Sequence, residues 1–175
     1  LQRAELLGLL DHPLLQRDVN NHIAVAFDYL RFGEAEESIQ VLTKALEAVE
    51  SEDPDGRRVQ RLLEELAFTS LKAGELSNRD NPSARLVCTL PLGNQQGHQN
   101  PEGSTNAIKY FLRLLEFEPD NLKYRWLLNI AHMTLGTYPA SVPEQFLIPQ
   151  ALLATDYDIG RFEEVAHALG LNAAN

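Results

Sequence analysis

Apolar side chains recur at steps of three and four residues over long stretches of this chain, and this spacing constrains the fold more than any other feature. An α-helix turns once every 3.6 residues, so the spacing gathers the apolar side chains on one helical face. One such pattern runs through Ile23 and Leu30, a second runs through Ile39 and Val49, and Gly33 stands between them. The sequence therefore predicts two amphipathic helices joined by a tight turn, as in an antiparallel helix pair.

The same spacing predicts further helices elsewhere in the chain. Short ones are expected at residues 4–10 and 160–169, and longer ones at residues 57–72, 104–117 and 122–135. Helices commonly end at a glycine and begin after a small polar residue, so Gly74 is expected to end the third long pattern and Ser104 to be the N-cap of the next. Because helical patterns cover most of the chain, we expect an all-α fold.

Two segments break the helical pattern. Residues 77–103 are rich in Asn, Gln, Gly and Pro, and Pro82, Pro91 and Pro101 forbid a continuous helix there. We expect a long irregular insert. After residue 138 the recurrent X-Pro pairs favour an extended path, because proline restricts the residue before it to extended conformations.

The helix pairs invite comparison with repeats of about 34 residues, in which one helix-turn-helix unit stacks on the next. Ala107 and Phe111, followed by Pro119, resemble the second helix and terminator of a tetratricopeptide repeat. Leu128 and Gly136 resemble the first helix of the following unit. The resemblance implies about three stacked pairs, the second of which closes around the 77–103 insert.

A second resemblance covers residues 88–171. The segment from Cys88 to Pro91, and the block from Trp126 to Pro149 with its spacing of Trp and Pro, resemble the helical region before the FG-GAP β-propeller in bacterial ASPIC/UnbV proteins, relatives of cartilage acidic protein. This resemblance implies a repeat domain over residues 1–138. Residues 139–175 would be a Pro-rich connector with a short helix, leading toward a propeller that the chain does not include. Such relatives are usually exported, which implies a periplasmic or secreted protein, while a cytoplasmic location stays open.

Composition removes several classes of partner. The chain of 175 residues has 25 acidic and 15 basic side chains, and its net charge of −10 argues against nucleic-acid binding, which depends on clustered Lys and Arg. No apolar run approaches the roughly 18 residues that a membrane span needs. The single cysteine, Cys88, has no second cysteine with which to form an internal disulfide.

In stacked helix pairs the first helix of each pair lines the concave face, and that register predicts a mostly apolar groove. We expect its lining to comprise Ile23, Phe27, Leu30, Phe68, Leu71, Trp126, Ile130 and Met133. One interpretation is that this stripe is ordinary core, covered by the insert and the Pro-rich tail. The other is that it receives an extended apolar segment of a partner, with Trp126 as an anchor.

Soft ligands suggest a candidate metal site. Cys88 and His98 lie ten residues apart in the insert, and with His132 they offer the sulfur and imidazole ligands that suit Cu(I) or zinc. No paired Cys or His motif supports the site. The competing interpretation is structural, with Cys88 packed as a small apolar residue and His98 hydrogen-bonded to backbone carbonyls.

Catalytic motifs are not found in the sequence: it contains no nucleophile elbow, no phosphate-binding glycine loop and no His-Glu-x-x-His. We therefore expect a non-enzymatic scaffold, without a cofactor, that docks a partner protein or a following β-propeller. Two alternatives remain open. One is a metal-binding or redox accessory domain using Cys88 and His98. The other is a self-assembling subunit of an extracellular polymer, a homo-oligomer in which repeats stack end to end.

Overall fold

The computed structural model describes residues 18–54, 56–79 and 97–153. These residues contain no strand, which confirms the all-α prediction. They form five α-helices and two short 3₁₀ helices: α2 (Val19–Arg31), α3 (Ala35–Glu50), α4 (Arg57–Ser77), α5 (Glu102–Phe117), α6 (Leu122–Thr134), η3 (Glu144–Phe146) and η4 (Gln150–Leu152). The helices expected at residues 4–10 and 160–169 lie outside the described residues, as does Cys88.

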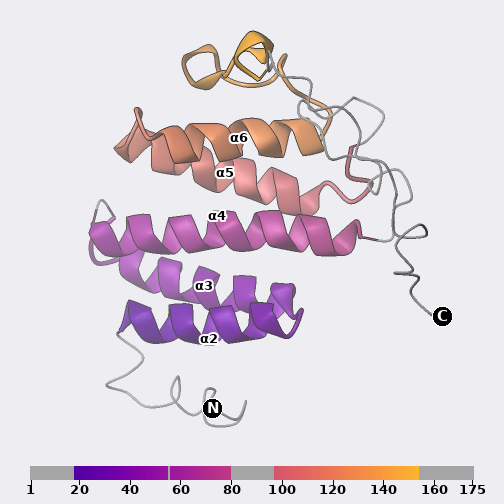
Figure 1. Ribbon diagram of the computed structural model, residues 1–175. Coiled ribbons are helices and arrows are strands. Elements are labelled where there is room, and N and C mark those ends of the chain that lie inside the picture. The colour runs from indigo at the N-terminus through magenta and orange to yellow at the C-terminus, as the bar shows by residue number, and fades with distance from the viewer. Residues whose placement is uncertain (1–17, 55, 80–96, 154–175) are drawn as a thin grey trace, which may run out of the picture.

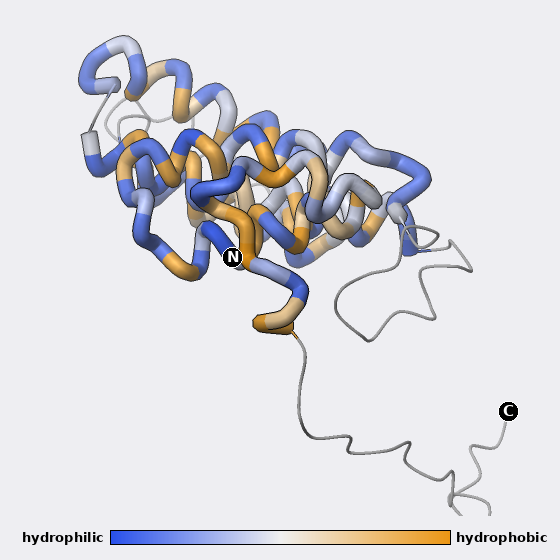
Figure 2. The backbone as a smooth tube through the Cα atoms, turned by 90° about the horizontal axis from the view of Figure 1, so that it is seen from above, coloured by the Kyte–Doolittle hydropathy of each residue, from blue (hydrophilic) through white to orange (hydrophobic). Residues whose placement is uncertain are grey.

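The helices lie in layers in chain order, from α2 at one end to α6 at the other (Figure 1). Each helix packs against the next, and α4 also contacts α2. Figure 2 shows hydrophilic and hydrophobic stretches interspersed along the helical part of the backbone. The apolar faces meet in one core whose fully buried members include Leu62, Leu63, Leu66, Phe111 and Leu128. The pair α4–α5, separated in sequence by the expected insert, packs together as predicted.

The turns and caps follow from local sequence. Gly33 has φ +81° between α2 and α3, and Gly136 has φ +68° after α6. This left-handed backbone costs glycine little because it has no Cβ, and both predicted helix ends are confirmed. Side chains cap two helix starts: Asp18 accepts a hydrogen bond from the Asn20 N–H, and Asn121 accepts from the N–H groups of Lys123 and Tyr124.

The junction of α4 and α5 differs from the sequence prediction. Helix α4 continues past Gly74 to Ser77, and α5 begins at Glu102, before Ser104. A Cβ at Gly103 would lie only 2.4 Å from the backbone nitrogen of Gly74, so the crossing of these helices leaves no room for a side chain there. Gly74 therefore lies at a close contact between helices and does not end one. Ser104 is buried inside α5, with its Oγ 2.8 Å from Thr134 Oγ1.

Two asparagines join the end of α4 to the segment that leads into α5, and we call this pair the clasp. Asn78 is buried and donates its Nδ2–H to the carbonyl of Asn100 at 2.9 Å. Its Oδ1 accepts the Asn100 N–H, also at 2.9 Å. One side chain thus satisfies the backbone donor and acceptor of a residue 22 positions away. The clasp helps to fix the approach to α5, together with His98, whose Nδ1 lies 2.9 Å from Ser104 Oγ.

Residues 138–153, here called the strap, fold back over α6. Short 3₁₀ turns interrupt the predicted extended path, with extended backbone kept at Pro143 and Pro149. Asn129 of α6 donates to the Phe146 carbonyl at 2.9 Å and accepts the Ile148 N–H at 3.1 Å. These bonds hold the strap on the helix.

A second apolar cluster lies between the strap and α6. Met133, Tyr138 and Val142 are its buried members, and Ile130, Leu147 and Leu153 pack against it. The Tyr138 hydroxyl donates to the Ile148 carbonyl at 2.7 Å and ties the strap to itself. The expected domain boundary at residue 138 is therefore not marked by a break in packing, since the described part of the predicted connector shares this cluster with α6.

Candidate docking groove

An open groove of about 370 Å³ runs between α2 and α4. Its walls contain four of the eight residues predicted for the partner groove: Ile23, Phe27, Leu30 and Phe68. Phe27 is the most exposed of them, with 60 % of its surface open to solvent. A phenylalanine at this exposure in a hollow surface is a feature of interaction sites more than of a finished core.

The other four residues predicted for the groove lie in different parts of the structure. Leu71 is half-buried against the main core. Ile130 and Met133 face the strap, and Met133 is only 1 % exposed. The predicted continuous stripe is therefore interrupted, because the strap covers this part of α6.

Trp126 lies outside both the α2–α4 groove and the contact between α6 and the strap. It is 38 % exposed and belongs neither to the α2–α4 groove nor to the buried clusters. Its cover by the insert and the Pro-rich tail stays a prediction, because residues 80–96 and 154–175 lie outside the described residues. Leu122, one helical turn earlier on α6, is also exposed, so the two side chains form a small apolar surface where α6 begins.

The α4 wall of the groove is supported by aromatic and charged contacts around Phe68. The Phe68 ring meets the buried Phe111 ring edge to face, with centroids 6.1 Å apart and planes at 86°. The Lys123 ammonium lies 5.3 Å from the centre of the Phe68 ring and pairs with Glu64. Because Phe68 is fixed on two sides, the groove is largely formed before any partner binds.

Three charged side chains line the groove: Arg31, Glu65 and Lys72. Arg31 and Lys72 already have carboxylate neighbours: Arg31 Nη1 lies 3.5 Å from Asp28 Oδ1, and Lys72 Nζ lies 2.8 Å from Glu75 Oε2. The third is Glu65. Its position in the groove could have been predicted from its spacing to Lys72. The two residues are seven positions apart, so they lie on one face of the helix, two turns from each other.

Glu65 has an unusual electrostatic environment. Burial raises the pKa of its carboxyl, and the adjacent Glu64 raises it further, while Arg61 and Lys123 oppose the shift. Half-burial in an apolar groove disfavours the charged form because water solvates it less well. A perturbed acid lining a hollow surface is a candidate for a binding role.

The two histidines of the predicted metal site are engaged in separate hydrogen bonds. His98 Nδ1 lies 2.9 Å from Ser104 Oγ, and His132 Nδ1 lies 2.9 Å from Thr137 Oγ1. Burial lowers the pKa of both imidazoles, which favours their neutral forms. Within residues 18–54, 56–79 and 97–153, no three His, Cys, Asp or Glu side chains gather as metal ligands. Because Cys88 lies outside these ranges, the site stays a prediction.

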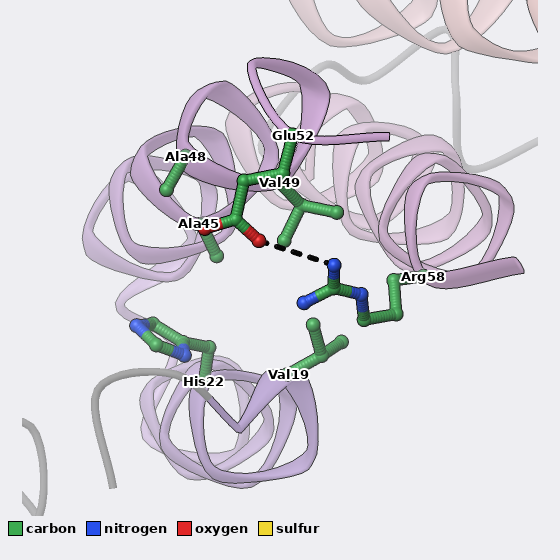
Figure 3. Close-up of a pocket in the computed structure, with 7 residues that line it drawn as sticks. All are labelled: Val19, His22, Ala45, Ala48, Val49, Glu52 and Arg58. Atoms are coloured by element: carbon green, nitrogen blue, oxygen red, sulfur yellow. Dashed lines mark hydrogen bonds and ion pairs between the residues drawn. The ribbon is translucent and has the colours of Figure 1, made fainter. Parts of the chain in front are cut away.

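A smaller hollow of about 280 Å³ lies where α2, α3 and the start of α4 meet (Figure 3). Its walls are mainly the small apolar side chains Val19, Ala45 and Val49. The ion pair of Arg58 with Glu52, at 3.2 Å, crosses it and neutralises its two charges. With its polar groups paired and no aromatic anchor among its lining residues, this hollow is a weaker candidate than the α2–α4 groove.

A scan of protein-family models finds no family that matches the chain, and searches of curated proteins and of solved structures find no significant match. In the part of the chain that the structure describes, no helix has the length and apolar character needed to cross a membrane.

Proposed function

We propose that this protein is a non-enzymatic scaffold that docks an apolar segment of a partner protein in the α2–α4 groove. The observation that carries the proposal is the exposed Phe27 in a groove whose opposite wall, Phe68, is held by buried contacts. Burying an aromatic side chain is worth about 1.5–3 kcal/mol, and such residues supply much of the energy of protein interfaces. Either a separate protein or a following β-propeller could provide the segment.

A displayed library of random peptides, selected on the full chain, tests the proposal. We expect enriched peptides to share spaced apolar residues and to bind Phe27→Ala at least about tenfold more weakly than the wild type, the equivalent of about 1.4 kcal/mol. Phe32→Ala is the matched control, because Phe32 caps the same helix, is 73 % exposed and lies outside the groove lining. Equal losses in the two variants, or no enrichment at all, would contradict the proposal.

A metal-binding or redox accessory role is the second candidate. It is favoured by His132, which is buried and whose Nε2 has no hydrogen-bond partner in the described part of the chain. Copper or zinc would be the expected ion. Metal analysis of protein purified without chelator, compared with a Cys88→Ser/His98→Ala variant, decides it: equal and negligible metal in both eliminates this role.

The layered helix pairs also support the proposal that the repeats are tetratricopeptide-like. A relation to ASPIC/UnbV proteins and a periplasmic or secreted location stay predictions from the sequence resemblance. Self-assembly is a third proposed role, for which the exposed Leu122 and Trp126 on α6 provide an apolar contact surface. Measurement of molecular mass across a concentration series tests it. A monomer throughout excludes assembly.

A further inference from the structure

We infer that the segment accepted by the α2–α4 groove carries a Lys or Arg among its apolar residues, and that this cation pairs with Glu65. The inference rests on the proposed docking function and adds the chemistry of the partner. It follows from where Glu65 lies, from which neighbouring charges already have partners, and from the cost of covering its carboxylate.

Glu65 occupies the middle of α4 and lines the groove together with apolar and aromatic side chains. It is half-buried before any partner binds, and it forms no direct ion pair in the part of the chain described. A partner that fills the groove would remove much of the water that still reaches this carboxylate. An uncompensated buried charge is strongly unfavourable, so an entirely apolar segment would bind poorly here.

The charged groups nearest to Glu65 do not provide the missing partner. Lys123 pairs with Glu64, and Arg61 Nη1 donates to Asn20 Oδ1 at 2.6 Å. Both cations lower the pKa of Glu65 from a distance, but burial and the Glu64 charge outweigh them. A further cation close to Glu65 would therefore stabilise the charged form of its carboxylate.

The other two charges of the groove lining differ from Glu65 in this respect. Lys72 pairs with Glu75 and Arg31 with Asp28, so each already has a counterion. A basic group on the partner thus meets a carboxylate, that of Glu65, which forms no ion pair within the described residues. An acidic group at the other end would have to compete with existing pairs. Charge complementarity selects a cation on the partner, near the position of Glu65.

Charge reversal tests this chemistry directly. Peptides are selected from the displayed library on the wild-type chain and, separately, on Glu65→Lys, Glu65→Gln and Glu47→Lys. The last is the matched control, because Glu47 is an exposed glutamate on α3 outside the groove and its substitution changes the net charge equally. Circular dichroism and thermal melts establish that each variant is folded. Glu65→Gln keeps the test valid if Glu65→Lys does not fold.

We expect wild-type peptides to be enriched in a Lys or Arg at a fixed place among apolar residues. They should bind Glu65→Lys about tenfold or more weakly and Glu65→Gln about three- to tenfold more weakly, in the range of a partly desolvated ion pair. Exchange of the peptide cation for Glu should restore binding to Glu65→Lys. The Glu47→Lys control should bind like the wild type.

Two failures are distinguishable. If peptides depend on Phe27 but bind the wild type, Glu65→Gln and Glu47→Lys equally, the pairing with Glu65 is refuted while the docking function stands. If no peptide depends on Phe27, the docking function itself fails. Weakening of binding to the same extent in Glu47→Lys and Glu65→Lys would show a general charge effect and also overturn the inference.

Discussion

Gly103→Ala adds a single methyl group at a close backbone contact between α4 and α5. The added Cβ would lie 2.4 Å from the nitrogen and 2.6 Å from the Cα of Gly74, and 2.6 Å from the carbonyl oxygen of Ser70. All three atoms belong to the α4 backbone, which cannot turn aside as a flexible side chain does. The two helices must therefore move apart, and the layers on both sides must adjust with them.

The expected loss follows from two opposing effects. Overpacking of a well-packed contact costs about 1–3 kcal/mol, and an approach this short to backbone atoms belongs at the upper end of that range. Alanine gains up to about 1 kcal/mol over glycine in helix propensity. The net prediction is a loss of about 2 kcal/mol in the free energy of unfolding, which lowers Tm by roughly 4–8 °C in a chain of this size.

Urea denaturation followed by circular dichroism measures this loss, and Gly74→Ala is the matched control. Gly74 lies in the interior of α4 at the same crossing, but a Cβ there would meet its nearest atoms, in His98 and the Ser104 nitrogen, at 3.4 Å. Its substitution should change stability by less than about 1 kcal/mol, since ordinary contact and helix propensity both tolerate alanine. Equal stability of Gly103→Ala and Gly74→Ala would refute the reasoning.

Two further predictions concern the strap and pH. Asn129→Leu should release the strap and lower the free energy of unfolding by about 2–3 kcal/mol, because the backbone groups of Phe146 and Ile148 lose their buried partner. Limited proteolysis within residues 138–153 should then be faster than in the wild type. An unchanged cleavage rate contradicts this prediction. Since burial lowers the pKa of His132, the unfolded chain binds a proton more readily, and stability should fall as pH drops below about 6.5. Thermal melts across this range should show a weaker pH dependence in His132→Asn, and an identical dependence argues against the assignment.

Local sequence was sufficient to predict the helices, because each carries its own apolar period and several end at a residue with a specific backbone role. Gly33 and Gly136 show this, since each has the left-handed conformation expected after a helix. Gly74 shows the limit. A glycine within a helical pattern signals a helix end or a close contact equally well, and only the position of Gly103 across the crossing decides between them.

The candidate site was only partly predictable for a related reason. Helical register identifies which side chains share a face, and Phe27 and Phe68, which it groups together, both line the α2–α4 groove. Register does not reveal which neighbour covers a face, so it could not show that the strap buries Met133. Glu65 was missed because its significance comes from burial and from a missing counterion, neither of which a single sequence displays.

The clasp has a consequence for how this chain tolerates change. Asn78 and Asn100 join the end of α4 to the segment before α5 by two hydrogen bonds that belong to neither helix ladder. The entropic cost of closing a loop rises by only about 0.6 kcal/mol for each doubling of its length. Insertion of a tag or an epitope between Asn78 and Asn100 is therefore expected to leave the junction of α4 and α5 folded while both asparagines are kept.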